Sequence, residues 1–288
     1  MLESRSICHL KIRVSQGLFM RQDFLTNLTN VEILVLDFGS QYTQLIARRL
    51  REVGVYTEIV PYFETIDSIK AKSPKGIILS GGPASVYEKD AYKPDPEIFS
   101  LGIPILGICY GMQYIAHFFG GEVVRAEAQE FGKAVLEIGK DSNALFAGVK
   151  QESIVWMSHA DKVQKVPQGF VELAKSGNTQ NCAIADFTRH IYALQFHPEV
   201  VHSECGAEIL RNFAVGICGA NTTWNMKNFA QQEIERLRAI VGQGGGFISK
   251  SEAYREFGEA KSIERLTQIW EDGAKATHTL LVRICKTI

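Results

Sequence analysis

Short, nearly continuous apolar runs that stop at a glycine or a turn constrain this chain most strongly. The run Val31–Asp37 (VEILVLD) is β-branched and stops just before Gly39. A strand of this kind is buried on both faces, which is typical of parallel sheets covered by helices. Similar runs occur at Gly76–Leu79 and Ile105–Ile108, while Tyr42–Val53 carries apolar residues at helical spacing. The sequence therefore predicts strands alternating with helices.

Beyond these elements, the alternation of strands and helices continues at first and then gives way to a strand-rich stretch. Thr57–Pro61 and Tyr110–Phe119 continue the alternation as strand and helix. The stretch Glu122–Phe196 is instead rich in strand signals and turns (VVRA, AVLEI, SIVWM, FVELA, CAIADF, IYALQF), which indicates antiparallel strands added at one edge. The predicted fold class is α/β, an open mixed, mostly parallel sheet flanked by helices.

The chain divides into three predicted parts. Residues 1–30 form an N-terminal extension with a weak transit-peptide composition, and residues 31–241 form one domain that closes with helices at Cys205–Ile217 and Trp224–Ile240. Gly242–Gly246 (GQGGG) begins a glycine-rich linker, followed by a short polar tail, so that 242–288 forms the third part.

Charge and cysteine usage exclude several classes of function. The 31 basic and 32 acidic residues give a net charge of -1, which predicts no nucleic-acid or membrane-surface partner. No apolar run approaches the roughly 20 residues that span a bilayer. The six cysteines have no paired spacing, so neither a metal site nor a disulfide framework is predicted, and a cytoplasmic location fits best.

Cys109 is the candidate nucleophile. A cysteine in an apolar run is usually inert core. Here, however, a strand runs into Gly107-Ile108-Cys109-Tyr110-Gly111 and a helix follows, which is the pattern of a nucleophile elbow. Backbone N–H groups and the positive end of the helix dipole would stabilise a thiolate at this position.

His197 and Glu199 are the candidate base and its orienting carboxylate. They lie in Gln195-Phe196-His197-Pro198-Glu199 at the end of a predicted strand, where residues i and i+2 project to the same side. A lone His-Pro-Glu is more often a surface turn. Combined with an elbow cysteine, it completes a nucleophile, histidine and carboxylate set.

Backbone donors for an oxyanion are predicted beside the elbow. Leu79-Ser80-Gly81-Gly82-Pro83 follows a strand, and such a turn is commonly no more than a tight exit. Placed next to Cys109, the N–H of Gly82 would serve as one oxyanion donor and the N–H of Tyr110 as the other.

Several segments together resemble the triad class of glutamine amidotransferases, in the flavodoxin-like class I fold. The segments VLDFGSQYTQLIARRLRE, IILSGGPASVY, GICYGMQ, VWMSHADKV and FHPEVVHS are similar to the glutaminase domains of the GMP synthase family over about residues 31–240. The resemblance implies Cys109, His197 and Glu199 as a catalytic triad. It also implies Gly82 and Tyr110 as oxyanion donors.

The resemblance further implies a substrate site and a partner. Gln113, Ser158 and His159 match positions near bound glutamine, and Ala160 stands where the family often has glycine. Glutamine hydrolysis needs no metal or organic cofactor in this family. ATP and magnesium serve the synthetase half, a GMP synthetase (ATP pyrophosphatase) domain or subunit that accepts the ammonia. No loop of the Ser-Gly-Gly-Val-Asp-Ser-Ser type occurs after Gly242, so the glutaminase half alone is expected.

Three alternatives stay open from the sequence. The first is the amidotransferase subunit of another enzyme, such as anthranilate or aminodeoxychorismate synthase, against which the DFGSQYTQLIARR segment argues. The second is a non-catalytic interaction module on the same fold, which the intact triad disfavours. The third is a cysteine peptidase or related hydrolase on an elbow of the same architecture.

Overall fold

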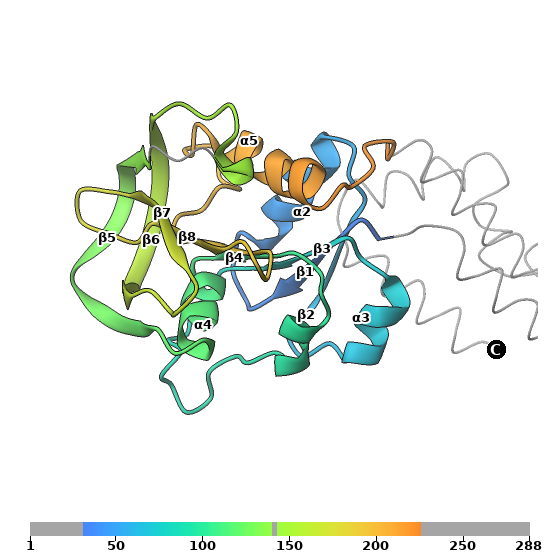
Figure 1. Cartoon of the computed structure of the whole chain (residues 1–288), viewed down its shortest axis with the longest axis horizontal. Coiled ribbons are helices and arrows are strands. Elements are labelled where there is room, and N and C mark those ends of the chain that lie inside the picture. Colours follow the sequence, from blue (N-terminus) through green and yellow to red (C-terminus); the bar gives the residue numbers. More distant parts are fainter. Residues whose placement is uncertain (1–30, 140–142, 226–288) are drawn as a thin grey trace, which may run out of the picture. The chain divides into compact units, whose positions relative to one another are not determined.

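A nine-stranded mixed sheet organises the part of the chain that the structure describes. The structure is a computed structural model that describes residues 31–139 and 143–225. The strand order is β2-β1-β3-β4-β9-β8-β7-β5-β6 (Figure 1). Four neighbouring pairs are parallel and four are antiparallel. This confirms the predicted mixed α/β sheet.

The parallel half contains the buried apolar runs. Its strands are β1 (Ile33–Asp37), β2 (Thr57–Pro61), β3 (Gly76–Leu79), β4 (Ile105–Ile108) and β9 (Ile191–Leu194). Strands β3, β4 and β9 are buried at every residue, as expected for strands covered by helices on both faces. The segment IYALQF joins the two halves of the sheet, because β9 pairs in parallel with β4 and antiparallel with β8.

The antiparallel half extends the sheet beyond β9. It comprises β8 (Ala183–Asp186), β7 (Val171–Lys175), β5 (Glu122–Ile138) and β6 (Glu152–Lys165). β5 and β6 form a long pair whose register shifts between Arg125 and Glu130, and they lie together at one end of the sheet (Figure 1). The predicted antiparallel edge is therefore confirmed for these strands.

Helices cover both faces of the sheet. α2 (Thr43–Glu52) and α5 (Gly206–Arg211) lie on one face, while α3 (Ile66–Lys72) and α4 (Tyr110–Phe118) lie on the other (Figure 1). Short helical turns occur at Pro96–Ser100 and Ala144–Phe146. No described helix has the length and apolarity that crossing a membrane requires.

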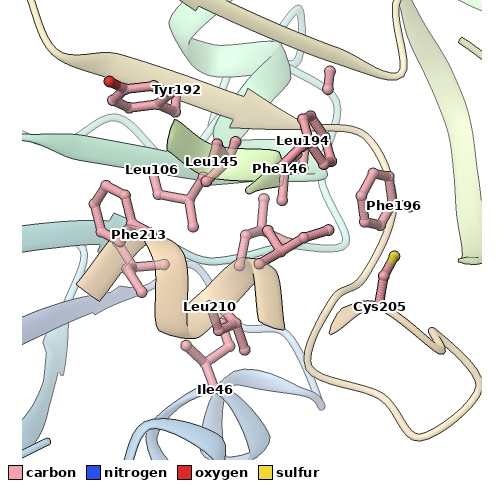
Figure 2. Packing of buried hydrophobic residues seen from close by; sticks show 14 of the residues in the cluster. Ile46, Leu106, Leu145, Phe146, Tyr192, Leu194, Phe196, Cys205, Leu210 and Phe213 are labelled. Carbon is pink, nitrogen blue, oxygen red and sulfur yellow. The ribbon is translucent and has the colours of Figure 1, made fainter. Parts of the chain in front are cut away.

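Apolar side chains fill the space between the sheet and its helices. On the α2 and α5 face, Leu106 and Leu194 from the strands pack with Ile46, Leu210 and Phe213 from the helices (Figure 2). All five are at most 1% exposed. Burying one such side chain stabilises the fold by about 1.5–3 kcal/mol. This core holds the ends of β4 and β9 in fixed positions.

The closing helix departs from regular α geometry. Cys205–Ile217 was predicted as one helix, and the structure has α5 followed by a π-helical segment, Asn212–Ile217. A Cβ atom at Gly206 would collide with the carbonyl of Pro198, so the start of α5 packs directly on the His-Pro-Glu segment. Of the predicted helix at Trp224–Ile240, all but its first two residues lie outside the described residues, as do 1–30 and 242–288.

Candidate active site

The carboxyl ends of three neighbouring strands bring the predicted site residues together. Gly82 follows β3, Cys109 follows β4 and His197 follows β9. Because β4 lies between β3 and β9 and all three run parallel, their carboxyl ends share one edge of the sheet. The Cys109 N–H donates to the carbonyl of Leu194 at 2.7 Å, which joins two of these strand ends directly. Ligand sites of open α/β sheets commonly lie at this edge.

The elbow predicted at Cys109 has a strained backbone. Its φ of 52° and ψ of -103° lie outside the regions that residues with a side chain ordinarily adopt. A Cβ atom at Gly107 would lie 2.7 Å from the carbonyl of Gly111, and one at Gly111 would collide with the carbonyl of Leu79. Both glycines are therefore required by close backbone approach.

Glu199 fixes the imidazole of His197. Its Oε1 lies 2.7 Å from Nδ1 of His197, and the two side chains are 0% and 5% exposed. The backbone of His197 is held as well, since its N–H donates to the Trp156 carbonyl and its carbonyl accepts from Ser203 Oγ at 2.6 Å. With Nδ1 bound to the carboxylate, Nε2 is left for the sulfur of Cys109.

The environment of His197 favours its charged form. Burial opposes a charge there, but hydrogen bonds with Cys109 and Glu199, and the negative charges of both, raise the pKa of His197 well above its ordinary value. The charged imidazolium form of His197 is therefore favoured beside the sulfur of Cys109. By contrast, burial raises the pKa of Cys182 and of Cys218 to about 12, and that of Cys205 is raised by burial too. Among the described cysteines, burial therefore makes these three unreactive thiols.

The predicted oxyanion donors lie side by side. A Cβ at Gly82 would be 3.4 Å from the ring of Tyr110 and 2.8 Å from the carbonyl of Phe38, so a side chain has no room there. Tyr110 is the first residue of α4, and the first N–H groups of a helix have no intrahelical acceptor. Gly82 thus lies beside Tyr110, the residue that follows Cys109 in the chain.

The predicted glutamine-binding residues lie where β6 passes the elbow. The Ser158 carbonyl is 3.7 Å from the sulfur of Cys109. Gln113 Nε2 donates to the Asp161 carbonyl at 2.7 Å, and His159 Nδ1 lies 3.1 Å from the same oxygen. Gln113 thus holds the 158–161 segment against α4, and the His159 contact lies within that segment. Ala160 has no positive φ, so its methyl group fits without backbone strain.

Two residues at this site were given no role from the sequence. Gln195 is fully buried, and its Nε2 lies 3.9 Å from the sulfur of Cys109. Glu130 is the cross-strand partner of His159, and its Oε2 lies 3.3 Å from Nε2 of that histidine. It also accepts from Ser176 and Thr179. The motif around His197 contains Gln195 and so offered a signal, whereas Glu130 depends on a strand register that the sequence does not reveal.

The polar groups around Cys109 define the chemistry that the site can support. They are one imidazole, one carboxylate behind it, one amide and backbone N–H and carbonyl groups. Among residues 31–139 and 143–225, no three His, Cys, Asp or Glu side chains are grouped to hold a metal ion. The set around Cys109 suits a thiol nucleophile that acts on an acyl or amide carbon.

Fold and site together define an α/β protein with a cysteine, histidine and glutamate triad at the carboxyl edge of its sheet. The family model for glutamine amidotransferase class-I matches residues 34–217. The chain belongs to the class-I glutamine amidotransferase family.

Curated relatives narrow the family further. A GMP synthase (glutamine-hydrolyzing) of Helicobacter pylori is 66% identical over 209 residues, which is 73% of this chain and 41% of the relative. The enzyme of the same name from Wolinella succinogenes is 54% identical over 242 residues, 80% of this chain and 46% of the relative. This chain therefore corresponds to the glutamine amidotransferase part of such proteins and spans less than half of their length.

Solved structures agree with the fold. The crystal structure of a GMP synthase subunit from Thermoplasma acidophilum is 38% identical with a TM-score of 0.57, covering 72% of this chain and 98% of that one. A glutamine amidotransferase of Thermotoga maritima has a TM-score of 0.51 at 20% identity, covering 74% and 97%. The second likeness shows the fold alone.

Proposed function

We propose that this chain is a glutaminase that releases ammonia from glutamine for the amination of xanthosine monophosphate to GMP. The observation that carries the proposal is the contact of His197 with both Glu199 and Cys109, at a strained elbow. The GMP synthase relatives supply the acceptor reaction.

The first half of the reaction forms a thioester. The Cys109 thiolate attacks the side-chain amide carbon of glutamine, forming a C–S bond while the carbonyl electron pair moves to oxygen. The N–H groups of Gly82 and Tyr110 stabilise this oxyanion. When the intermediate collapses, the C–N bond breaks and the His197 imidazolium gives its proton to the leaving nitrogen, which departs as ammonia.

The second half regenerates the enzyme. Neutral His197 takes a proton from water, and the hydroxide attacks the thioester carbon. The C–S bond breaks, and glutamate and the Cys109 thiolate are left. Glu199 holds the imidazole in one orientation and stabilises its charge through both steps. Cysteine supplies the covalent intermediate, so this half requires no metal or organic cofactor, and ATP and magnesium belong to the amination step.

A GMP synthetase domain or subunit is the proposed ammonia acceptor. The Thermoplasma acidophilum structure supports this, because nearly all of that chain is matched by a part of the present one. Glutamine binding is assigned to Gln113, Ser158 and His159, which surround the elbow from α4 and β6. The unpaired cysteines Cys109, Cys182, Cys205 and Cys218 support a cytoplasmic location.

Two assays on the purified chain test the proposal. Ammonia release from glutamine should be measurable and should be lost in Cys109→Ala. With ATP, magnesium and xanthosine monophosphate added, the chain alone should form no GMP. Hydrolysis that survives in Cys109→Ala would refute the assigned nucleophile. GMP formed by the chain alone would refute the proposal that a separate synthetase domain or subunit carries out the amination.

A further inference from the structure

Gln195 is a buried amide beside the reacting sulfur. It lies one residue beyond β9, and its backbone N–H donates to the Cys182 carbonyl at 2.8 Å. Its side chain is 0% exposed, and its Nε2 lies 3.9 Å from Sγ of Cys109, near the outer limit of an N–H···S contact. Its Oε1 has no hydrogen-bond partner among the described residues.

An amide placed in this way does not serve the stability of the fold. A buried polar oxygen without a partner costs free energy, and an apolar side chain of the same shape would avoid that cost. Cores retain such groups most often where function requires them. The position of the Gln195 amide is therefore better explained by the sulfur that it contacts.

Besides His197, the sulfur of Cys109 has two polar neighbours with opposite effects in the part of the chain that the structure describes. The Ser158 carbonyl, 3.7 Å away, accepts from the thiol and offers nothing favourable to a thiolate. The amide N–H of Gln195 donates, and a donor stabilises an anionic acceptor more than a neutral one. A thiolate has no proton to give, so the amide presents its N–H to the sulfur.

We propose that Gln195 is a further catalytic residue, whose side-chain amide donates a hydrogen bond to the Cys109 thiolate. The hydrogen bond offsets the Ser158 carbonyl and keeps the thiolate populated before glutamine binds. This inference deepens the proposed glutaminase activity and rests on Cys109 as its nucleophile. Other groups also set the charge of the sulfur: His197 contacts it, while Glu199 and His159 face that imidazole.

The test is the pH profile of Cys109 alkylation in the full chain. Iodoacetamide reacts with the thiolate, and mass spectrometry of the Cys109 peptide separates this thiol from the other five. In Gln195→Met, which keeps the shape and removes the donor, the midpoint should rise by about one pH unit. The melting temperature should equal or exceed that of the wild type, whereas loss of a merely structural residue would lower it.

Two further variants make the result decisive. Gln195→Asn keeps a buried amide but shortens it, so it should also raise the midpoint, and it serves if Gln195→Met does not fold. Gln180→Met is the matched control, because the Gln180 side chain is exposed and, within residues 31–139 and 143–225, bonds only Glu172. Its midpoint should equal that of the wild type.

The outcomes separate this inference from the proposed function. An unchanged midpoint in a folded Gln195 variant would overturn the role of Gln195, even if the wild type hydrolyses glutamine. If the Gln195 variants have a raised midpoint but the wild type releases no ammonia from glutamine, the role of Gln195 stands and the glutaminase proposal is refuted instead.

Discussion

The two halves of the sheet make different contributions to the site. The parallel half places Cys109 and His197 at the ends of β4 and β9, joined by a backbone hydrogen bond and enclosed by helices. The antiparallel half contributes the 158–161 segment of β6, held by side chains rather than by strand ends. The comparison teaches that parallel strand ends fix the residues assigned to catalysis, while the antiparallel pair carries those assigned to glutamine binding.

This division predicts different kinetic effects in the two halves. Changes in the parallel half should lower kcat, because they remove groups that act in the transition state. Changes in the antiparallel half should raise KM for glutamine with kcat nearly retained. Each variant below tests one side of that contrast.

The largest effect is expected for Cys109→Ala. Removing the nucleophile should lower kcat for glutamine hydrolysis at least about 10⁴-fold, as for loss of a residue that acts in a triad. Circular dichroism and the melting temperature should remain close to wild type, because one sulfur atom is removed. Burial raises the pKa of the Cys182 thiol, so Cys182→Ala should retain hydrolysis. Equal losses in the two variants would contradict the assignment.

His197→Ala should cost more than Glu199→Ala, because His197 transfers protons and Glu199 orients it. The expected losses in kcat are about 10⁴-fold and about 10²-fold. In Glu199→Gln the imidazolium loses its carboxylate partner, so its pKa should fall. The alkaline limb of the rate profile should then move to lower pH. A limb that stays in place would show that Glu199 does not stabilise the charged imidazole.

In the antiparallel half, Glu130→Ala should raise KM for glutamine about 10-fold with little change in kcat. The carboxylate lies 3.3 Å from His159 Nε2 and accepts from Thr179 Oγ1 at 2.7 Å, so its loss frees the 158–161 segment. Glu137→Ala is the control on the same strand, since that side chain is half exposed and pairs with Lys175. A fall in kcat without a rise in KM would contradict the prediction that the antiparallel half acts on glutamine binding.

The smallest effect concerns the stored strain at the elbow. Glycine adopts positive φ without penalty, so Cys109→Gly should be more stable to denaturant than Cys109→Ala by about 1 kcal/mol. The free energy of unfolding from urea titration measures this difference. A Gly variant less stable than the Ala variant would show that φ at position 109 stores no strain.

Much of the parallel half could be predicted from sequence, because its signals are local. The apolar runs gave β3 and β4 their observed bounds, and Gly107 with Gly111 marked the elbow between strand and helix. The His-Pro-Glu spacing predicted the contact of His197 with Glu199. Each of these features depends on residues within a few positions of one another.

The antiparallel half was less predictable, because its contacts depend on register. Glu130 faces His159 only because the β5–β6 ladder shifts between Arg125 and Glu130. The parallel pairing of β9 with β4 likewise joins strands far apart in the sequence, so the segment IYALQF alone does not determine it. The role of Gln195 could be inferred only from its distance to the sulfur of Cys109, which lies 86 residues away in the sequence.

Labelling with a diazo-ketone analogue of glutamine tests the central claim most directly. The analogue combines a glutamine-like side chain with an electrophile, so it should react once per chain and at Cys109, as located by peptide mass spectrometry, and free glutamine should slow the reaction. Labelling at Cys182 or Cys205, or labelling that glutamine does not slow, would contradict a glutamine site built on Cys109, His197 and Glu199.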